Sequence, residues 1–397
     1  MFLGGAAAAL RLGGFQTPGA FDFQKEKEKV LARIRPPKFP GRVFEITKFG
    51  AVAGADATEA IHQAIGVCSQ AGGGRVLVPQ GVFLTGAIHL ESNIDLHLME
   101  GAVLRFSTDP KRYLPLVFTR WEGTECMNYS PLIYAFEREN VAVTGMGTLD
   151  GQAGDGHWWP WKGAEQFGHR KGEPEQSAAR TALMSMGEKD VPASQRLFGE
   201  GHYLRPNFIQ PYRCANVLIE GVRIVRSPMW EVNPVLCRNV TVRNLRIDSH
   251  GPNNDGCDPD ACSGVLIEGC EFNTGDDCIA IKAGRNRDGR RVGVACEDIV
   301  AQNCVMKDGH GGVAIGSEAS GGVRNVFIDR CRMDSPQLQR ALRIKTSSYR
   351  GGAIENVFFA NSTVGQVAEA VLDIDFNYEE GKGGPFPPVV RNVLLET

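Results

Sequence analysis

The sequence predicts an all-β protein built as one right-handed parallel β-helix, and three observations support this prediction. A short phrase, Asn-Val or a close variant, recurs along the chain, and its positions Val217, Val240 and Val265 lie 23 and 25 residues apart. β-Branched and apolar residues alternate within each phrase, and clusters of Gly, Asn and Asp follow it. No helical pattern separates the phrases. Periods of about 20–50 residues indicate a solenoid, and strands this short favour a β-helix over leucine-rich repeats or a β-sandwich.

The N-terminal region is expected to precede the coils. We interpret residues 1–40 as the remnant of a secretory signal followed by a charged, proline-bearing arm, and residues 41–397 as a single domain. The first 14 residues have the apolar and small residues of a signal but lack its basic leader. A disordered Ala/Gly tail is the alternative interpretation.

A capping helix is expected at the N-terminal end of the coils. Residues 44–51 predict a first strand, apolar residues then recur at helical spacing, and Gly72-Gly73-Gly74 ends that pattern. A helix here would cover the edge that an open solenoid end exposes. Its apolar stripe would consist of Ile61, Ala64, Ile65 and Cys68.

A long surface insertion is predicted for residues 152–203, which break the repeat. Loops of this length are usually functional or disordered, and Trp158, Trp159 and Trp161 argue against disorder. Two interpretations stay open. The insertion could close one end of a groove, with its tryptophans stacked on bound sugars, or the tryptophans could pack it onto the coils. The chain ends at residues 391–397, where a further coil is expected to begin.

Composition and charge exclude several classes of protein. The formal net charge of −3 argues against a general basic surface and against a nucleic-acid partner. No run of about 18 apolar residues predicts a membrane span. The 11 cysteines include no Cys-x-x-Cys pair, which argues against a zinc site. We interpret them as buried residues stacked along the interior, and a disulfide such as Cys257–Cys262 stays open.

Four motifs carry the chemistry, and their spacing predicts that they lie together. Residues one coil apart in a β-helix stack about 4.8 Å from each other. Asp255 and Asp276 are 21 residues apart, close to one coil, and the longer intervals contain insertions such as residues 284–291. We therefore expect a column on four successive rungs. The motifs are Asn253-Asn254-Asp255, Gly275-Asp276-Asp277, Gly309-His310-Gly311 and Arg343-Ile344-Lys345.

Carboxylates, an imidazole and two cations in one column suit acid/base attack on a glycosidic bond in an anionic polymer. A carboxyl with like-charged neighbours has a raised pKa, which keeps one member of a cluster protonated. Each aspartate alone, and His310 alone, is also explained as a turn residue, and Arg343 with Lys345 as a solvated pair. A purely structural role is harder to assign to the Asp276-Asp277 doublet, because successive strand residues point to opposite faces. Both carboxylates can face solvent only if Asp276 lies on a bend. Arg343 and Lys345 share one strand face and could clamp a substrate carboxylate.

The four motifs, in this order, resemble the signature of the family 28 glycoside hydrolases, the polygalacturonases. The likeness covers roughly residues 43–380 and includes Phe49-Gly50-Ala51, while Asn254 replaces the family's usual threonine. It implies a right-handed parallel β-helix that hydrolyses α-1,4-galacturonan with inversion at the anomeric carbon, without a metal or other cofactor. Residues 125–134 and 157–161 resemble the exo-acting bacterial branch.

Carried over residue by residue, the resemblance implies a role for each site residue. Asp276 would be the general acid, Asp255 and Asp277 would hold and activate the water, and His310 would support protonation of the acid. The substrate-binding residues would be Asn253, Arg343, Lys345 and Tyr378. The partner would be pectin or polygalacturonate, and we expect a monomeric protein that is secreted or periplasmic.

Three other functions stay open at this point. A calcium-dependent pectate lyase shares the fold and the substrate, but it needs an arginine base, and His310 with an aspartate doublet argues against it. A non-catalytic β-helix that adheres to polysaccharide would have no need of three clustered aspartates. A hydrolase of rhamnogalacturonan is the third alternative, although Gly309-His310-Gly311 and Arg343-Ile344-Lys345 favour a uniform galacturonan.

Overall fold

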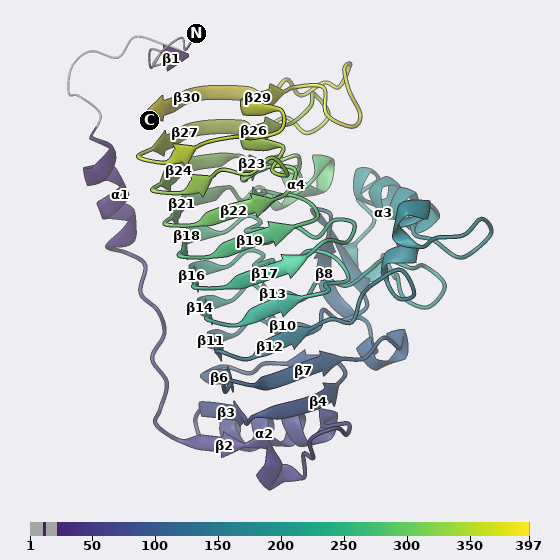
Figure 1. Ribbon diagram of the computed structural model, residues 1–397. Helices are drawn as coiled ribbons and strands as arrows, with labels where there is room; N and C mark the ends of the chain where they lie inside the picture. Colours follow the sequence, from purple (N-terminus) through teal and green to yellow (C-terminus); the bar gives the residue numbers. More distant parts are fainter. Residues whose placement is uncertain (1–10, 13–21, 397) are drawn as a thin grey trace.

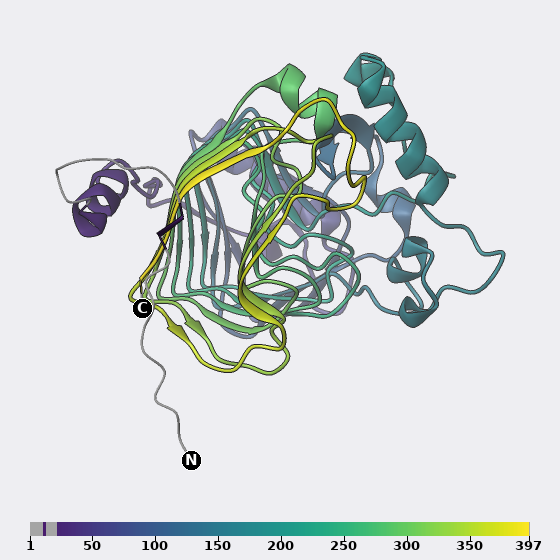
Figure 2. The same ribbon diagram turned by 90° about the horizontal axis from the view of Figure 1, so that it is seen from above.

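The protein is a right-handed parallel β-helix, as predicted (Figure 1). The computed structural model describes residues 11–12, for their backbone only, and residues 22–396. The predicted signal remnant falls almost entirely outside the described residues. Seen from above, each coil of the solenoid passes through three faces, and strands of successive coils lie on top of one another (Figure 2). Pairing between successive coils is parallel throughout the described solenoid.

The first face is a long sheet that runs the length of the solenoid. Its strand β30, from the last coil, pairs in antiparallel fashion with β1 at the edge and in parallel with β27. In chain order it comprises β1 (Arg11–Leu12), β2 (Val43–Glu45), β3 (Gly74–Val78), β6 (Ile94–Leu98), β11 (Glu139–Gly145), β14 (Ala215–Glu220), β16 (Arg238–Arg243), β18 (Ser263–Glu268), β21 (Cys296–Gln302), β24 (Val323–Asp329), β27 (Ala353–Ala360) and β30 (Val389–Glu396).

The second face follows the first across a tight turn in each coil, and its strands are shorter. It comprises β4 (Gly81–Thr85), β7 (Ala102–Phe106), β12 (Thr148–Asp150), β15 (Arg223–Val225), β17 (Arg246–Ser249), β19 (Glu271–Thr274), β22 (Val305–Asp308), β25 (Arg332–Met333) and β28 (Thr363–Val364).

The third face has two stretches of sheet joined by single bridges, so that it is continuous along the solenoid. The bridges run from Ile209 through Val232 and Cys257 to Ile279. Because the register is kept across them, side chains of successive coils form straight columns on its outer surface. The strands are β5 (Ile88–His89), β10 (Ile133–Phe136), β13 (Ile209–Tyr212), β20 (Ile279–Ile281), β23 (Val313–Ile315), β26 (Arg340–Lys345) and β29 (Ala370–Asp375).

The recurring Asn-Val phrase has a structural cause in the first sheet. Its asparagine adopts a positive φ, 58° at Asn216 and 56° at Asn239, a conformation that asparagine tolerates better than most residues. The side chains then hydrogen-bond from coil to coil, as from Asn239 Nδ2 to Asn216 Oδ1 at 2.7 Å. The valine that follows points inward, and Val217 and Val240 are completely buried. One residue thus makes the bend, and the next fills the core.

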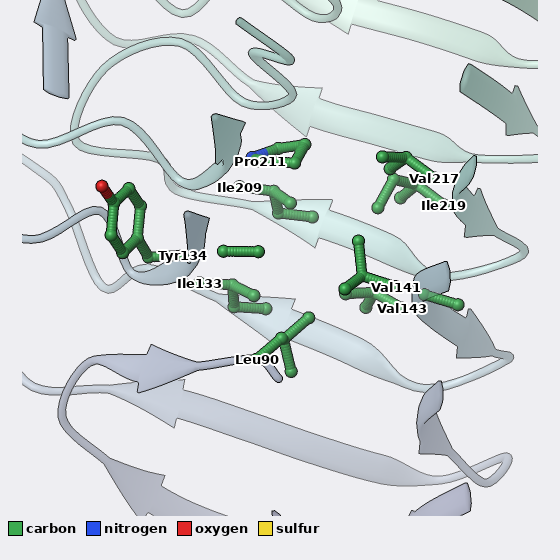
Figure 3. Close-up of a pocket in the computed structure, with 11 residues that line it drawn as sticks. Leu90, Ile133, Tyr134, Val141, Val143, Ile209, Pro211, Val217 and Ile219 are labelled. Atoms are coloured by element: carbon green, nitrogen blue, oxygen red, sulfur yellow. The ribbon is translucent and has the colours of Figure 1, made fainter. Parts of the chain in front are cut away.

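The interior of the solenoid is apolar. Figure 3 shows Val141 and Val217 of the first sheet opposite Ile133 and Ile209 of the third, across a narrow gap. All eleven cysteines are free and buried, which confirms their prediction as small interior residues, and Cys257 and Cys262 form no disulfide. The cysteines stack in register, with backbone N–H groups donating to the sulfur one coil away.

The N-terminal end is capped by helix α2 (Thr58–Gln70), as predicted. Its buried side chains include all four residues of the expected stripe. Helix α1 (Phe23–Leu31) and the chain after it run along the outside of the first sheet (Figure 1). Phe23, Val30 and Ile34 pack there against Phe327 and its neighbours, and Lys27 forms a buried ion pair with Asp329.

The predicted insertion is an ordered structure beside the third face (Figure 2). Trp158 is 2% exposed and contacts Tyr113 edge-on, Trp159 donates to Ser227 O at 2.9 Å, and Trp161 packs on the core. The tryptophans therefore anchor the insertion, as in the second of the two interpretations. Its elements are η3 (Trp159–Lys162), η4 (Glu165–Phe167), α3 (Ser177–Glu188) and η5 (Ala193–Gln195).

Candidate active site

The four motifs form the predicted column. Gly256 N donates to Asp277 O at 2.9 Å, Cys278 N donates to Gly311 O at 2.8 Å, and Gly312 N donates to Arg340 O at 2.8 Å. These bonds place the motifs on four successive coils at the start of the third face. Close passage of the coils requires glycine: a Cβ at Gly309, where φ is 146°, would lie 2.5 Å from Asp276 O.

Three carboxyl groups meet at the centre of this column. One oxygen from each of Asp255, Asp276 and Asp277 lies within 4.8 Å of the others. Asp276 lies on a bend, as its outward orientation requires, and its side chain is 17% exposed. The other two carboxyls are almost completely buried. Asp276 is therefore the member of the cluster most accessible to solvent.

Each carboxyl of the cluster has a cationic partner one or two coils further along the solenoid. His310 Nδ1 lies 3.0 Å from Asp276 Oδ1, and Lys345 Nζ donates to Asp277 Oδ2 at 2.6 Å. Lys282 Nζ lies 3.6 Å from Asp255 Oδ2. The Oδ1 atoms of Asp255 and Asp277 are buried and have no protein partner.

The electrostatics differ among the three carboxyls. Burial, with the charge of Asp276, raises the pKa of Asp255 well above its ordinary value, although Lys282 opposes the shift. Burial also tends to raise the pKa of Asp276, but the hydrogen bond and charge of His310, with Lys345, outweigh it and lower that pKa. The bond to Asp276 raises the pKa of His310. In the unliganded protein these shifts favour the proton of the pair on His310 over Asp276.

The remaining predicted residues surround this cluster. Arg343 is 12% exposed and lies 3.6 Å from Asp373, with its guanidinium over the ring of Tyr378. Lys345 is buried against Asp277 and also lies over Tyr378. Asn253 adopts a positive φ of 55°, and its side-chain oxygen accepts from Lys162 and Arg205. Asn254 is completely buried and holds the turn through Ser227 O and Met229 O at 3.1 Å each.

Several charged residues of the site were missed by the sequence analysis. Lys282 follows the aspartate doublet and shares its register position with Lys345, so the strand alternation could have indicated it. Glu231 and Asp258 are completely buried near Asp255, their oxygens have no partner, and burial raises the pKa of both. No motif marked either residue.

One end of the column is covered by a hairpin, β8 (Val117–Trp121) and β9 (Thr124–Asn128). Thr119 donates to Gln210, Gln210 donates to Arg120 O at 3.2 Å, and Arg120 pairs with Asp260 at 2.8 Å, with all these groups buried. The hairpin therefore lies directly on the third face, from the coil of Gln210 to the coil that carries Asp255 and Asp260. The insertion packs behind it, with Leu183 of α3 and Trp121 in one apolar cluster.

An ion network joins the hairpin to five other segments of the chain. Arg285, before α4 (Asn286–Val292), is 4% exposed and pairs with Glu122 of the hairpin and Glu379 of the loop after β29. Arg180 of α3 contacts the same two glutamates at 2.7 and 3.0 Å. The members of this network are Glu122, Arg180, Arg285, Glu318, Arg350, Glu379 and Glu380.

A parallel β-helix with three clustered carboxyls and paired cations on its outer face is the arrangement of a polysaccharide-cleaving protein. The sequence pattern of the glycosyl hydrolases family 28 matches residues 194–392. The exopolygalacturonase of Thermotoga maritima is 48% identical, with a TM-score of 0.90, over 93% of this chain and 83% of that one. This chain belongs to family 28 of the glycosyl hydrolases.

Two curated relatives extend the comparison. A probable polygalacturonase of Vitis vinifera is 29% identical over 77% of this chain and 57% of its own length. The exo-poly-alpha-D-galacturonosidase of Dickeya chrysanthemi is 24% identical over 86% of this chain and 58% of its own. The chain thus spans less than two thirds of the length of these relatives.

Proposed function

We propose that this protein hydrolyses α-1,4-galacturonosidic bonds in polygalacturonate, releasing units from chain ends. The observation that carries the proposal is the aspartate cluster on an accessible face, with a separate cation, Arg343, beside it. Family membership and the similarity to an exopolygalacturonase support the same activity.

Asp276 is the proposed proton donor. It is the carboxyl of the cluster most accessible to solvent, and its oxygen shares a proton with His310 Nδ1. Substrate binding displaces water from the groove and makes a separated ion pair less favourable. The proton then moves to Asp276, which passes it to the leaving oxygen. His310 keeps this proton available to Asp276 near neutral pH.

Asp255 and Asp277 are proposed to hold the attacking water. Their Oδ1 atoms are buried without protein partners, while Lys282 and Lys345 engage their other oxygens. Both carboxyls are almost completely buried, so that a water molecule reaches the sugar more readily than they do, which favours inversion. The carboxyl oxygens are nevertheless closer than the roughly 6.5–9.5 Å usual in inverting enzymes. Proton NMR of the first product distinguishes the two courses: β-galacturonate is expected, and α-galacturonate would contradict inversion.

Arg343 is proposed to bind a galacturonate carboxylate, with Tyr378 supporting its guanidinium. Its only acidic neighbour among the described residues is Asp373, at 3.6 Å, so its donors are largely unused. Lys345 acts through Asp277 instead of holding the substrate alone, because it is buried in that pair.

The exo mode of attack rests on the hairpin and the insertion behind it. They cover the third face on one side of the aspartates, so that a chain can extend only to the other side. Size analysis of early products from polygalacturonate tests the proposal. Mono- or digalacturonate with slowly falling viscosity is expected, whereas a ladder of longer oligomers would show endo attack. A matched digestion of rhamnogalacturonan should give little product.

The carboxylate cluster gives one observation in favour of a calcium-dependent lyase, since three acidic oxygens lie close together. Lys282 and Lys345 already neutralise two of them, and a divalent cation would have to displace both. Full activity in EDTA, with no unsaturated product in the ultraviolet, is expected for hydrolysis. Loss of activity in EDTA and its return with calcium would favour the lyase.

We also propose that the protein acts outside the cytoplasm, because the polymer is too large to reach an enzyme inside the cell. We propose in addition that it is a monomer. None of the helices in the described part of the chain combines the length and apolar character needed to cross a bilayer. Activity in the medium or periplasmic fraction of expressing cells, and a single-chain mass in solution, are the expected results.

A further inference from the structure

Lys162 is a cation without an acidic partner at the edge of the active site. It ends helix η3 of the insertion, and its Nζ donates to Asn253 Oδ1 at 3.1 Å. Within the described residues, no carboxylate forms an ion pair with it. An ammonium group that is taken out of water without a counter-ion is costly, and burial lowers the pKa of Lys162. Glu122 and Asp276 attract its charge, but neither forms an ion pair with it in the described structure, so a bound anion would be its first direct counter-ion.

A second cation fixes the orientation of Asn253. Arg205 is completely buried and donates to the same Oδ1 atom at 2.8 Å, to Pro252 O at 2.6 Å and to Pro228 O at 2.9 Å. Only the carbonyl oxygen of an amide can accept from two cations. The Nδ2 group of Asn253 is thus turned away from them, and no protein acceptor for it is found in the described structure. Lys162 and Asn253 together offer unused donors.

The position of these donors relates them to the aspartates. Asn253 lies on the coil of Asp255, Asp276 lies on the next coil, and Arg343 lies two coils further. Lys162 and Arg343 therefore stand on opposite sides of Asp276 along the solenoid axis. A galacturonan chain that crosses Asp276 carries a carboxylate on each unit, and one unit lies on each side of the bond to be cut.

We propose that Lys162, with Asn253, binds the carboxylate of the galacturonate unit opposite the unit held by Arg343. The insertion then determines specificity, because it supplies a charged contact to the substrate. This inference rests on the proposed hydrolysis of polygalacturonate and adds a subsite to it.

Singly methyl-esterified trigalacturonates test the assignment. Each isomer lacks the charge of one unit, and kcat/KM is measured for wild type, Lys162→Met and Arg343→Gln. On the fully ionised trimer, Lys162→Met should lower kcat/KM about 10–100-fold, the usual loss for a charge-assisted hydrogen bond. That loss should disappear for one isomer, and the loss in Arg343→Gln should disappear for a different isomer. Lys162→Arg should recover part of the rate.

The control is Lys171→Met, which removes an exposed lysine of the same insertion and should leave all substrates unchanged. A loss in Lys162→Met that is equal for every isomer would overturn the inference, because Lys162 would then only position Asn253. An unchanged rate on the ionised trimer would overturn it too. Both outcomes leave the proposed function intact, whereas wild-type protein without activity on any trimer would remove its basis. Melting temperatures identify variants that fail to fold.

Discussion

The floor and the wall of the active site are held by different forces. The floor, the column from Asp255 to Arg343, is fixed by backbone hydrogen bonds between successive coils. The wall consists of the hairpin, α3 and the loop after β29, which meet through the ion network, as where Arg285 reaches Glu379 at 2.6 Å. The spacing of the proposed catalytic groups thus follows from the pitch of the solenoid. The position of the wall depends instead on side-chain ion pairs.

Removing the proton donor from the floor should have the largest effect. Asp276→Asn is expected to lower kcat on polygalacturonate by about 10²–10⁴-fold, the usual contribution of general acid catalysis. The melting temperature should stay close to that of wild type, since the backbone of the column is unchanged. The control is Asp248→Asn, which makes the same change at an exposed aspartate of β17, outside the aspartate cluster. A variant that keeps more than about a tenth of the rate would exclude Asp276 as the donor.

Removing the cation of the floor should have the next largest effect. Arg343→Gln is expected to lower kcat/KM on ionised polygalacturonate by about 10–100-fold, because a substrate carboxylate loses a charge-assisted partner. Fully methyl-esterified polymer should be a poor substrate for wild type and should be affected little by the substitution. Equal turnover of the two polymers by wild type would contradict carboxylate binding.

The pair of His310 and Asp276 should control the alkaline limit of activity. Because the pKa of His310 is raised, the pair keeps its proton below that pKa and loses it as the pH rises through it. In His310→Gln the proton is held by a carboxyl alone, which loses it at lower pH. The alkaline limb of kcat/KM against pH should therefore move to lower pH. An unchanged limb would place the ionisation on another group.

Loosening the wall should have the smallest effect on rate but change the products. Arg285→Met removes a buried member of the ion network, and its glutamate partners then repel one another. Longer oligomers should appear among early products, while the rate of bond cleavage falls less than about tenfold. Arg287→Met alters an exposed arginine of α4 that pairs with Asp190 and should leave the products unchanged. Identical products from both variants would show that the network does not shape the groove.

Much of the floor could be predicted from the sequence, and little of the wall. The period of the Asn-Val phrase determined the fold, because the αL asparagine and the inward valine recur in each coil. The same period placed Asp255 and Asp276 on neighbouring coils. The hairpin and the partners of Arg285 follow no period, since they join segments far apart in the chain. The role of the tryptophans was also ambiguous, because a packed and a sugar-binding tryptophan look alike in sequence.

The strap formed by α1 and the chain after it has a consequence for how the solenoid unfolds. Coils of a solenoid contact mainly their neighbours, so that such proteins can lose coils one at a time from an end. Here Lys27 is bonded to Asp329 on β24, and Arg35 exchanges hydrogen bonds with Asn239 on β16. The strap crosses several coils and joins sheet positions that do not touch each other. We therefore expect the strap to couple the unfolding of the coils that it crosses.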